Sequence, residues 1–102
     1  MIRVIDIETT GIDPTTDAII EIASVDMVRG GGITNAMDTL VHPGKPVPPR
    51  ASAIHHIIDD DLKDAPSLSE VIDRFRGADV YVAHNCEFER AFFAAQSIEL
   101  GP

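Results

Sequence analysis

The sequence predicts an α/β domain with a mixed sheet, in which the elements follow the order β-β-β-α-β-α. Two observations lead to this prediction. Residues 2–41 contain three β-branched, apolar stretches, and residues 67–96 change to the apolar spacing of helices on either side of one short β-prone stretch. This succession favours a layered α/β architecture with a hairpin at one side of the sheet.

Three strands are expected in the N-terminal half. Residues 2–8 are β-prone and end in a turn at Thr9-Thr10-Gly11. Residues 18–28 and 33–41 are two further β-branched stretches. The Gly30-Gly31-Gly32 segment between them indicates a hairpin.

The next segment, residues 42–50, contains four prolines and is expected to be a stiff surface connection. Ser67-Leu68-Ser69-Glu70 is a capping box that predicts the start of a helix. Residues 79–83 predict a short buried strand. Asn85 is placed as the N-cap of a last helix, whose apolar stripe consists of Phe88, Ala91, Phe92 and Ala95.

The composition restricts the function classes. The chain has 102 residues and a formal charge of −9, from 8 Lys and Arg against 17 Asp and Glu. No apolar run approaches the roughly 20 residues that cross a bilayer, so we expect no membrane partner. The single cysteine, Cys86, agrees with a reducing cytoplasm. The acidic balance disfavours nucleic-acid binding through clustered Lys and Arg, but it leaves open a nuclease built on carboxylates and metal.

Asp6 and Glu8 are the first candidates for chemistry. They lie two apart on the first predicted strand, so both side chains emerge on one face, near the strand end where open α/β sheets place ligands. Converging carboxylates raise one pKa unless a cation such as Mg²⁺ or Mn²⁺ binds them. The alternative is an edge strand with both acids in water. The flanking Ile5 and Ile7, and the strand's expected central place, disfavour it.

Glu89 is a further candidate, where the last predicted strand passes into the last helix. It lies about 100° around that helix from Phe88, so it flanks the apolar stripe and is able to point toward Asp6 and Glu8. A first-turn glutamate also stabilises the helix dipole with no further role, and from this residue alone that is the simpler interpretation. Glu87 is expected to face solvent.

Two other polar clusters are not expected to bind metal. Asp59-Asp60-Asp61 lacks the alternating spacing and the glycine of a calcium loop, so we interpret it as the acidic first turn of a short helix. His55 and His56 have no His-x-x-x-His pair or cysteine pair to support zinc. In a strand, only one of these adjacent histidines would face a site.

Three segments together resemble the DEDDh 3′–5′ exonucleases, the proofreading exonuclease family with a ribonuclease-H-like fold. The segments are Asp6-Ile7-Glu8-Thr9-Thr10-Gly11, Ala53-Ile54-His55 and Tyr81-Val82-Ala83-His84-Asn85-x-x-Phe88. The resemblance extends over about residues 3–96. Residues 21–26, and residues 40–41 before the proline-rich loop, narrow it to the exodeoxyribonuclease X branch.

The resemblance implies two-metal hydrolysis of phosphodiester bonds at a nucleic-acid 3′ end, most consistent with DNA. It makes Asp6, Glu8 and Glu89 the catalytic and metal-binding carboxylates, with Mg²⁺ or Mn²⁺ as the cofactor. Its pattern assigns substrate contacts to Thr9, Thr10, Gly11, His55, Asn85 and Phe88. Whether a second copy of the chain completes a homodimer is left open.

The chain departs from the family pattern at two points. Glu89 stands where the family usually has Asp, which keeps the charge on a stem one methylene longer. The third motif, which supplies a His general base and a fourth carboxylate, does not follow Glu89. We therefore interpret residues 1–102 as the N-terminal part of a single exonuclease domain, incomplete at its C-terminus, and expect little or no activity from this chain alone.

Two other functions remain open. One is a non-catalytic module that keeps the exonuclease fold and binds nucleic acid or protein, although the eight scattered basic residues disfavour tight DNA binding without metal. The other is an aspartyl-phosphate phosphatase, because Asp6-x-Glu8-x-Thr10 imitates its nucleophile loop. The absence of a downstream Lys followed by a paired-Asp motif disfavours the phosphatase.

Overall fold

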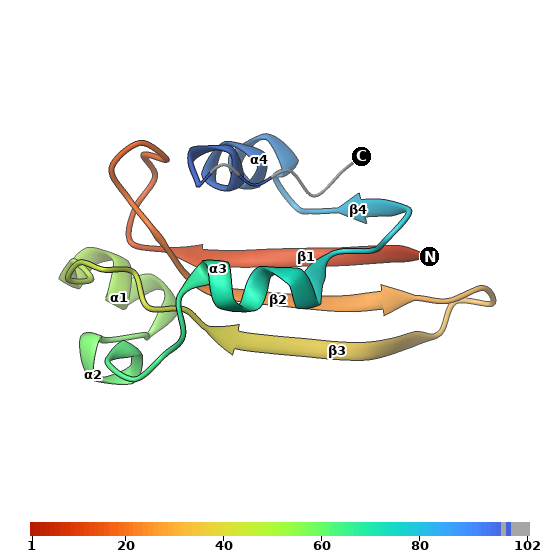
Figure 1. Cartoon of the computed structure of the whole chain (residues 1–102), viewed down its shortest axis with the longest axis horizontal. Coiled ribbons are helices and arrows are strands. Elements are labelled where there is room, and N and C mark those ends of the chain that lie inside the picture. The colour runs from red at the N-terminus through yellow and green to blue at the C-terminus, as the bar shows by residue number, and fades with distance from the viewer. Residues whose placement is uncertain (97, 99–102) are drawn as a thin grey trace.

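A four-stranded sheet in the order β3-β2-β1-β4 forms the centre of the computed structural model, which describes residues 1–96 and 98 (Figure 1). β1 (Ile2–Thr9) pairs antiparallel with β2 (Ile19–Met27), and β2 pairs antiparallel with β3 (Ile33–Leu40). β4 (Val80–Val82) pairs in parallel with β1. The predicted mixed sheet, the β2–β3 hairpin and the central place of the first strand are confirmed.

Short helical segments join β3 to β4, and a longer helix follows β4. They are α1 (Pro49–His55), α2 (Asp59–Leu62), α3 (Leu68–Val71), the 3-10 turn η1 (Ile72–Phe75) and α4 (Cys86–Ala95). The proline-rich connection is shorter than predicted, because Pro49 begins α1, where a backbone N–H has no helical partner to lose. The acidic first turn expected at residues 59–61 is confirmed, and the Ser67 N–H donates to Glu70 Oε1 at 3.1 Å, as the capping box predicts.

The helices α3 and α4, with η1, cover one face of the sheet (Figure 1). On β1 the odd-numbered residues point to this face, where Ile5 and Ile7 are buried. They pack with Phe75 of η1 and with Phe92 and Phe93 of α4. A second, smaller cluster joins the start of β2 to α1 and α2, through Ile20, Val47, Ala51, Ile57 and Leu62.

The opposite face of the sheet carries both acids of β1 and is open to solvent in the described part of the chain. Val80 and Val82 lie on this face, beside Ile2 and Val4, and they are 43% and 44% exposed. The strand predicted within residues 79–83 is therefore present, at Val80–Val82, but the expectation that it is buried was wrong. Among the described residues, β4 pairs only with β1, and neither valine belongs to a hydrophobic cluster.

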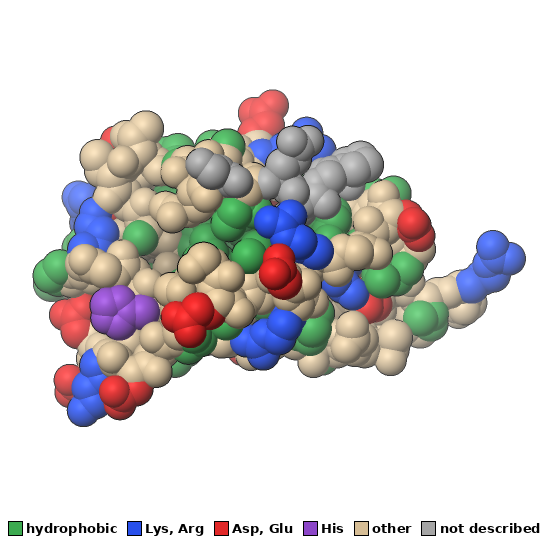
Figure 2. Space-filling view, in the orientation of Figure 1, with side chains coloured by type: hydrophobic (Ala, Val, Ile, Leu, Met, Phe, Trp, Pro, Cys, Tyr) green, Lys and Arg blue, Asp and Glu red, His purple; other side chains and the backbone are tan. Residues whose placement is uncertain are grey.

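None of the described helices is long and apolar enough to cross a membrane. On the face shown in Figure 2, basic and acidic side chains are interspersed over several elements instead of forming a basic stripe.

A buried ion pair joins β1 and β2 at the end of the sheet far from the acids. Arg3 and Asp26 are each 4% exposed, and Arg3 Nε donates to Asp26 Oδ1 at 2.7 Å. Asn35 Nδ2 donates to Asp26 Oδ2 at 2.9 Å, and Arg3 Nη1 donates to the Arg76 carbonyl at 2.9 Å. The hydrogen bonds from Arg3 and Asn35 lower the pKa of the Asp26 carboxyl. This network therefore connects β1, β2, β3 and the segment after η1.

Removing one partner of this pair should destabilise the protein strongly. We expect Arg3→Met to lower the free energy of unfolding by roughly 3–5 kcal/mol, because it leaves Asp26 buried without its counter-charge. Urea titration followed by circular dichroism measures the effect. The matched control is Asp73→Asn, which breaks the exposed Arg76 pair and should cost less than about 1 kcal/mol. A loss of similar size in both variants would contradict this interpretation.

Candidate functional site

The acids of β1 lie at the centre of a group of carboxylates on the open sheet face. Asp6 and Glu8 alternate onto this face, as predicted, and Glu8 lies directly opposite Glu21 of β2. Asp38 of β3 lies opposite Ala23, two residues from Glu21. Burial, a hydrogen bond with Asp38 and the nearby charges of Asp38, Glu8 and Asp6 raise the pKa of Glu21 to about 7.

Sequence reasoning missed Glu21 and Asp38. Both lie on predicted strands. Which side chains of those strands lie on the same sheet face as Asp6 and Glu8 depends on how the strands are paired in register, and composition does not specify that register. The alternation of apolar and polar residues on β2 was the available signal. It becomes informative only after Glu8 is paired with Glu21.

Glu89 approaches the same acids from α4. Its side chain is 5% exposed, and Oε2 has no hydrogen-bond partner among the described residues. Burial, together with the charge of Asp6, raises its pKa to about 7. Glu89 therefore faces the interior near Asp6, whereas Glu87 is exposed as predicted. A role confined to the helix dipole does not explain a buried carboxyl without a partner.

These carboxylates do not form a closed metal-binding group. In residues 1–96 and 98, no three His, Cys, Asp or Glu side chains are arranged so that they could hold an ion together. Asp6 itself is exposed. The unpartnered Oε2 of Glu89 and the raised pKa nevertheless fit a hard cation, because oxygen ligands that repel one another are stabilised by a shared positive charge.

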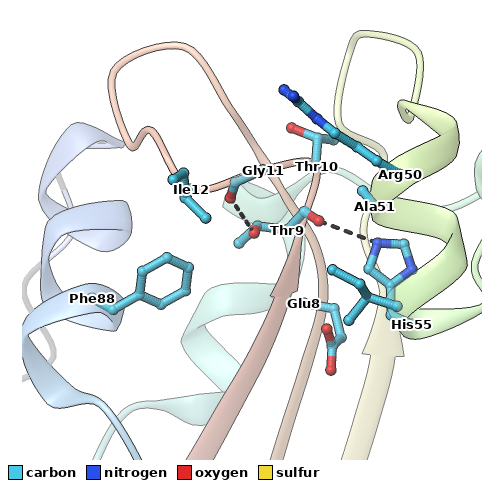
Figure 3. Close-up of a pocket in the computed structure, with 10 residues that line it drawn as sticks. Glu8, Thr9, Thr10, Gly11, Ile12, Arg50, Ala51, His55 and Phe88 are labelled. Carbon is cyan, nitrogen blue, oxygen red and sulfur yellow. Dashed lines mark hydrogen bonds between the residues drawn. The ribbon is translucent and has the colours of Figure 1, made fainter.

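A pocket of about 360 Å³ opens beside Glu8, between the end of β1, α1 and α4 (Figure 3). Phe88 of α4 forms one side, and its ring lies 4.8 Å from that of Phe92. His55 and Arg50 of α1 lie on the other side. The remaining residues that line it are Thr9, Thr10, Gly11, Ile12, Ala51 and Ile54. Sequence reasoning missed Ile12, Arg50, Ala51 and Ile54.

The turn that follows β1 is held by its own hydrogen bonds. Thr10 is fully buried, its N–H donates to the Ala18 carbonyl at 2.9 Å, and its Oγ1 donates to Asp17 Oδ1 at 3.0 Å. Thr9 Oγ1 donates to the Gly11 carbonyl at 2.6 Å. A Cβ at Gly11 would collide with the Asp17 carboxylate unless that group moved from its hydrogen bonds with the Thr10 hydroxyl and the Asp13 N–H. The N–H of Thr10 is thus already engaged, and Thr9, Thr10 and Gly11 all line the pocket.

The histidine pair ends a helix and does not lie in a strand, which corrects the expected setting. His55 is the last residue of α1, and His56 follows it in the left-handed region at φ 63°. His55 lines the pocket, and its Nε2 lies 3.2 Å from the Thr9 carbonyl. His56 is exposed. A left-handed residue after the helix turns the chain, so only one of the two histidines faces the pocket.

Asn85 is the N-cap of α4, as predicted. Its Oδ1 accepts a hydrogen bond from the Phe88 N–H at 3.3 Å. Asn85 is exposed and does not line the pocket. It positions Phe88 and Glu89 by fixing the first turn of the helix that carries them.

The fold and this arrangement define an exonuclease domain. Residues 4–98 match the RNase T exonuclease family, and the chain belongs to this family. It is 44% identical over 90 residues to exodeoxyribonuclease 10 of Escherichia coli (strain K12), an alignment that covers 88% of this chain and 39% of that protein. It is 40% identical over 104 residues to a DNA polymerase III subunit epsilon-like protein of Rhodobacter capsulatus, covering 96% of this chain and 15% of the relative.

Solved structures agree with the predicted ribonuclease-H-like fold. Exonuclease X in complex with 5′ overhanging duplex DNA is similar with a TM-score of 0.83 at 43% identity, over 90% of this chain and 53% of that one. E. coli exonuclease I in complex with a dT13 oligonucleotide shares the fold, with a TM-score of 0.74 at 15% identity, over 89% of this chain and 22% of that one. The predicted family and fold class are confirmed, and the chain spans well under two thirds of these relatives.

Neutralising Glu89 should change how stability depends on pH. An unfolded Glu titrates near about 4.3, so the folded protein binds more protons than the unfolded chain between that pH and about 7. Stability should therefore fall as pH rises from 5 to 8, and Glu21 contributes with the same sign. We expect Glu89→Gln to be more stable than the parent at pH 8, by roughly 1–3 kcal/mol, and the difference to shrink toward pH 5.

Urea titrations at intervals between pH 5 and 8 measure this dependence. The exposed neighbour gives a matched control, because Glu87→Gln should leave the slope unchanged. If the free energy of unfolding changed with pH equally in Glu89→Gln and in the parent, the surroundings of Glu89 would not raise its pKa.

Removing the cap should weaken α4. We expect Asn85→Ala to lower the free energy of unfolding by about 1 kcal/mol, because the Phe88 N–H loses its acceptor. Asn85→Ser keeps an acceptor at the same position and should retain most of the stability. Thermal unfolding of the three proteins tests this, and equal midpoints for Asn85→Ala and the parent would contradict the capping role.

Proposed function

We propose that this chain forms the part of a 3′–5′ exonuclease that holds the terminal nucleotide of DNA beside its metal-binding carboxylates. The observation that carries the proposal is the buried, unpartnered carboxyl of Glu89, facing Asp6 next to a pocket at Glu8. Its relatives support a DNA substrate, since one is an exodeoxyribonuclease and a solved one contains duplex DNA. Because the chain spans only part of these proteins, the activity and the substrate remain our proposal.

The pocket suits one nucleotide. Its volume of about 360 Å³ is at the small end of ligand pockets, which run from roughly 300 to 1,000 Å³. Phe88 offers an aromatic face, on which any base stacks regardless of its identity. Glu8 brings negative charge to one end of the pocket. With a cation held at the carboxylate end, a nucleotide would place its base against Phe88 and its phosphate toward that cation.

A divalent cation, Mg²⁺ or Mn²⁺, is part of this proposal. Asp6, Glu8 and Glu89 would hold it, since all three provide the oxygen ligands that hard cations prefer. When bound, such ions supply an activated water and stabilise the leaving oxygen in phosphodiester hydrolysis. Without a cation, these side chains and Glu21 would repel a phosphate, and we expect nucleic acid to bind weakly.

The protein's own residues prepare the site for the phosphodiester. His55 fixes the end of β1 through the Thr9 carbonyl, and the buried Thr10 fixes the turn that follows. Asn85 fixes the helix that carries Phe88 and Glu89. These contacts orient Phe88 and the carboxylates relative to one another before substrate binds, which lowers the entropy lost on binding.

A cytoplasmic location belongs to the same proposal and is supported by the single cysteine.

A second candidate is a non-catalytic module that keeps the exonuclease fold. The observation in its favour is that no three acidic or histidine side chains of the described residues are placed to hold an ion. Binding of a divalent cation separates the two candidates, because only the exonuclease needs it.

Cation binding should depend on Asp6. We expect calorimetry to detect Mn²⁺ binding to the parent protein, and Asp6→Asn to weaken it at least about tenfold, since the conservative change removes the charge that faces Glu89. Asp73→Asn, an exposed acid of η1, is the matched control and should bind as the parent does. Failure of the parent to bind Mn²⁺ at millimolar concentration would favour the non-catalytic module.

Activity should be weak in the isolated chain. We expect little or no release of mononucleotides from 3′-labelled single-stranded DNA in the presence of Mn²⁺, because the described carboxylates do not form a complete ion-binding group. Gel analysis of the labelled products measures it. Robust release that is lost in Asp6→Ala would contradict the expected weakness and, at the same time, establish the exonuclease function.

A further inference from the structure

Arg50 is the one Lys or Arg among the residues that line the pocket beside Glu8. It is the second residue of α1, and its side chain is exposed. Within the described part of the chain, no hydrogen bond or ion pair engages its guanidinium. Neither the family resemblance nor the carboxylate site assigns it a role. Its donors are therefore available to a phosphate that passes this end of the pocket.

Glu8 and Arg50 lie at opposite ends of the pocket. Figure 3 shows Glu8 on β1 at one end and the guanidinium of Arg50 at the other, past Thr10. Asp6 precedes Glu8 on the same sheet face, and Glu89 faces Asp6. The proposed cation therefore belongs to the Glu8 end, and the Arg50 end is free to contact another part of the substrate.

The polarity of a DNA strand determines what lies beyond each end of the pocket. Cleavage at a 3′ end breaks the phosphodiester between the terminal nucleotide and its neighbour, so that phosphate lies at the cation. The cleaved strand therefore leaves the pocket at the Glu8 end, and the Arg50 end lies beyond the 3′ terminus. In a duplex whose 3′ end is recessed, only the complementary strand continues past that terminus, as a 5′ overhang.

We propose that Arg50 binds the phosphate backbone of this 5′ overhang and gives the chain a preference for recessed 3′ ends, an inference that rests on the proposed function. A guanidinium forms charge-assisted hydrogen bonds with phosphate oxygens whatever the base sequence. Asp13 and Asp17 belong to the turn at this end, and their negative charges oppose part of the attraction. The preference should therefore be modest, as for other solvent-exposed ion pairs.

Binding of DNA hairpins to the whole chain tests this assignment, because the loop closes one end and leaves a single duplex end for the protein. Fluorescence anisotropy in the presence of Mn²⁺ measures the dissociation constants. The parent should bind a hairpin with a 5′ overhang about three- to fivefold more tightly than a blunt one. Arg50→Met should bind both hairpins equally, and the slope of its affinity for the overhang hairpin against salt should fall by about 1.

Three controls separate this contact from a general effect of charge. Arg29→Met removes an equal charge from the exposed turn between β2 and β3, and it should keep the preference. Arg50→Lys retains a charge that binds phosphate, and it should keep most of the preference. Single-stranded DNA has no complementary strand, so it should bind to the parent and to Arg50→Met alike.

The outcomes separate the inference from the proposed function. A preference for the 5′ overhang that is lost in Arg50→Met and kept in Arg29→Met supports the inference. Equal binding of both hairpins to the parent overturns it, as does a preference that survives in Arg50→Met. An equal loss of all DNA in Arg50→Met also overturns it, because Arg50 would then contact the cleaved strand. In each of these cases DNA still binds to the parent, and the proposed function stands. Failure of every DNA to bind overturns both.

Discussion

β1 has a strand on each side, and its side chains alternate between the covered, apolar face of the sheet and the open face that carries the acids. Ile5 and Ile7 enter the core beneath α3, η1 and α4, while Asp6 and Glu8 point to the open face. A one-residue shift in the pairing with β2 would exchange these two sets. The site therefore depends on the same register that forms the core, and the buried pair of Arg3 and Asp26 stabilises that register at the opposite end of the sheet.

Repulsion between neighbouring carboxylates determines the protonation of the acids near the open face. Glu21 and Glu89 belong to elements far apart in the sequence, and both have pKa values raised to about 7 by burial and by neighbouring acids. Such groups are stabilised by protons at low pH and by a shared cation at higher pH. Five acids, Asp6, Glu8, Glu21, Asp38 and Glu89, thus gather where the proposed cation binds, so the acids that disfavour free DNA there provide the ligands for the ion.

The pocket beside these acids is assembled from three segments of the chain. The turn after β1, the helix α1 and the helix α4 each contribute one side of it. His55 links the first two through the Thr9 carbonyl, and the Asn85 cap orients the third. Its residues differ in chemical character from one end to the other, with Glu8 at one end and Arg50 at the other. A cation held at the Glu8 end would allow a nucleotide to place its phosphate there, as the proposed function requires.

Much of this architecture could be predicted from the sequence, because its signals are local. The alternation of β1, the glycines of the hairpin and the caps at Ser67 and Asn85 each depend on neighbouring residues. They predicted the sheet, the helices that begin at Leu68 and Cys86, and the shared face of Asp6 and Glu8, whereas α1 was not predicted. The register that brings Glu21 opposite Glu8, the exposure of β4 and the approach of Arg50 to the pocket depend on pairing and packing between distant segments. Local sequence determined which residues could carry the chemistry. Only the tertiary structure decided which of them meet, because burial and like-charge repulsion arise between side chains that the chain brings together on folding.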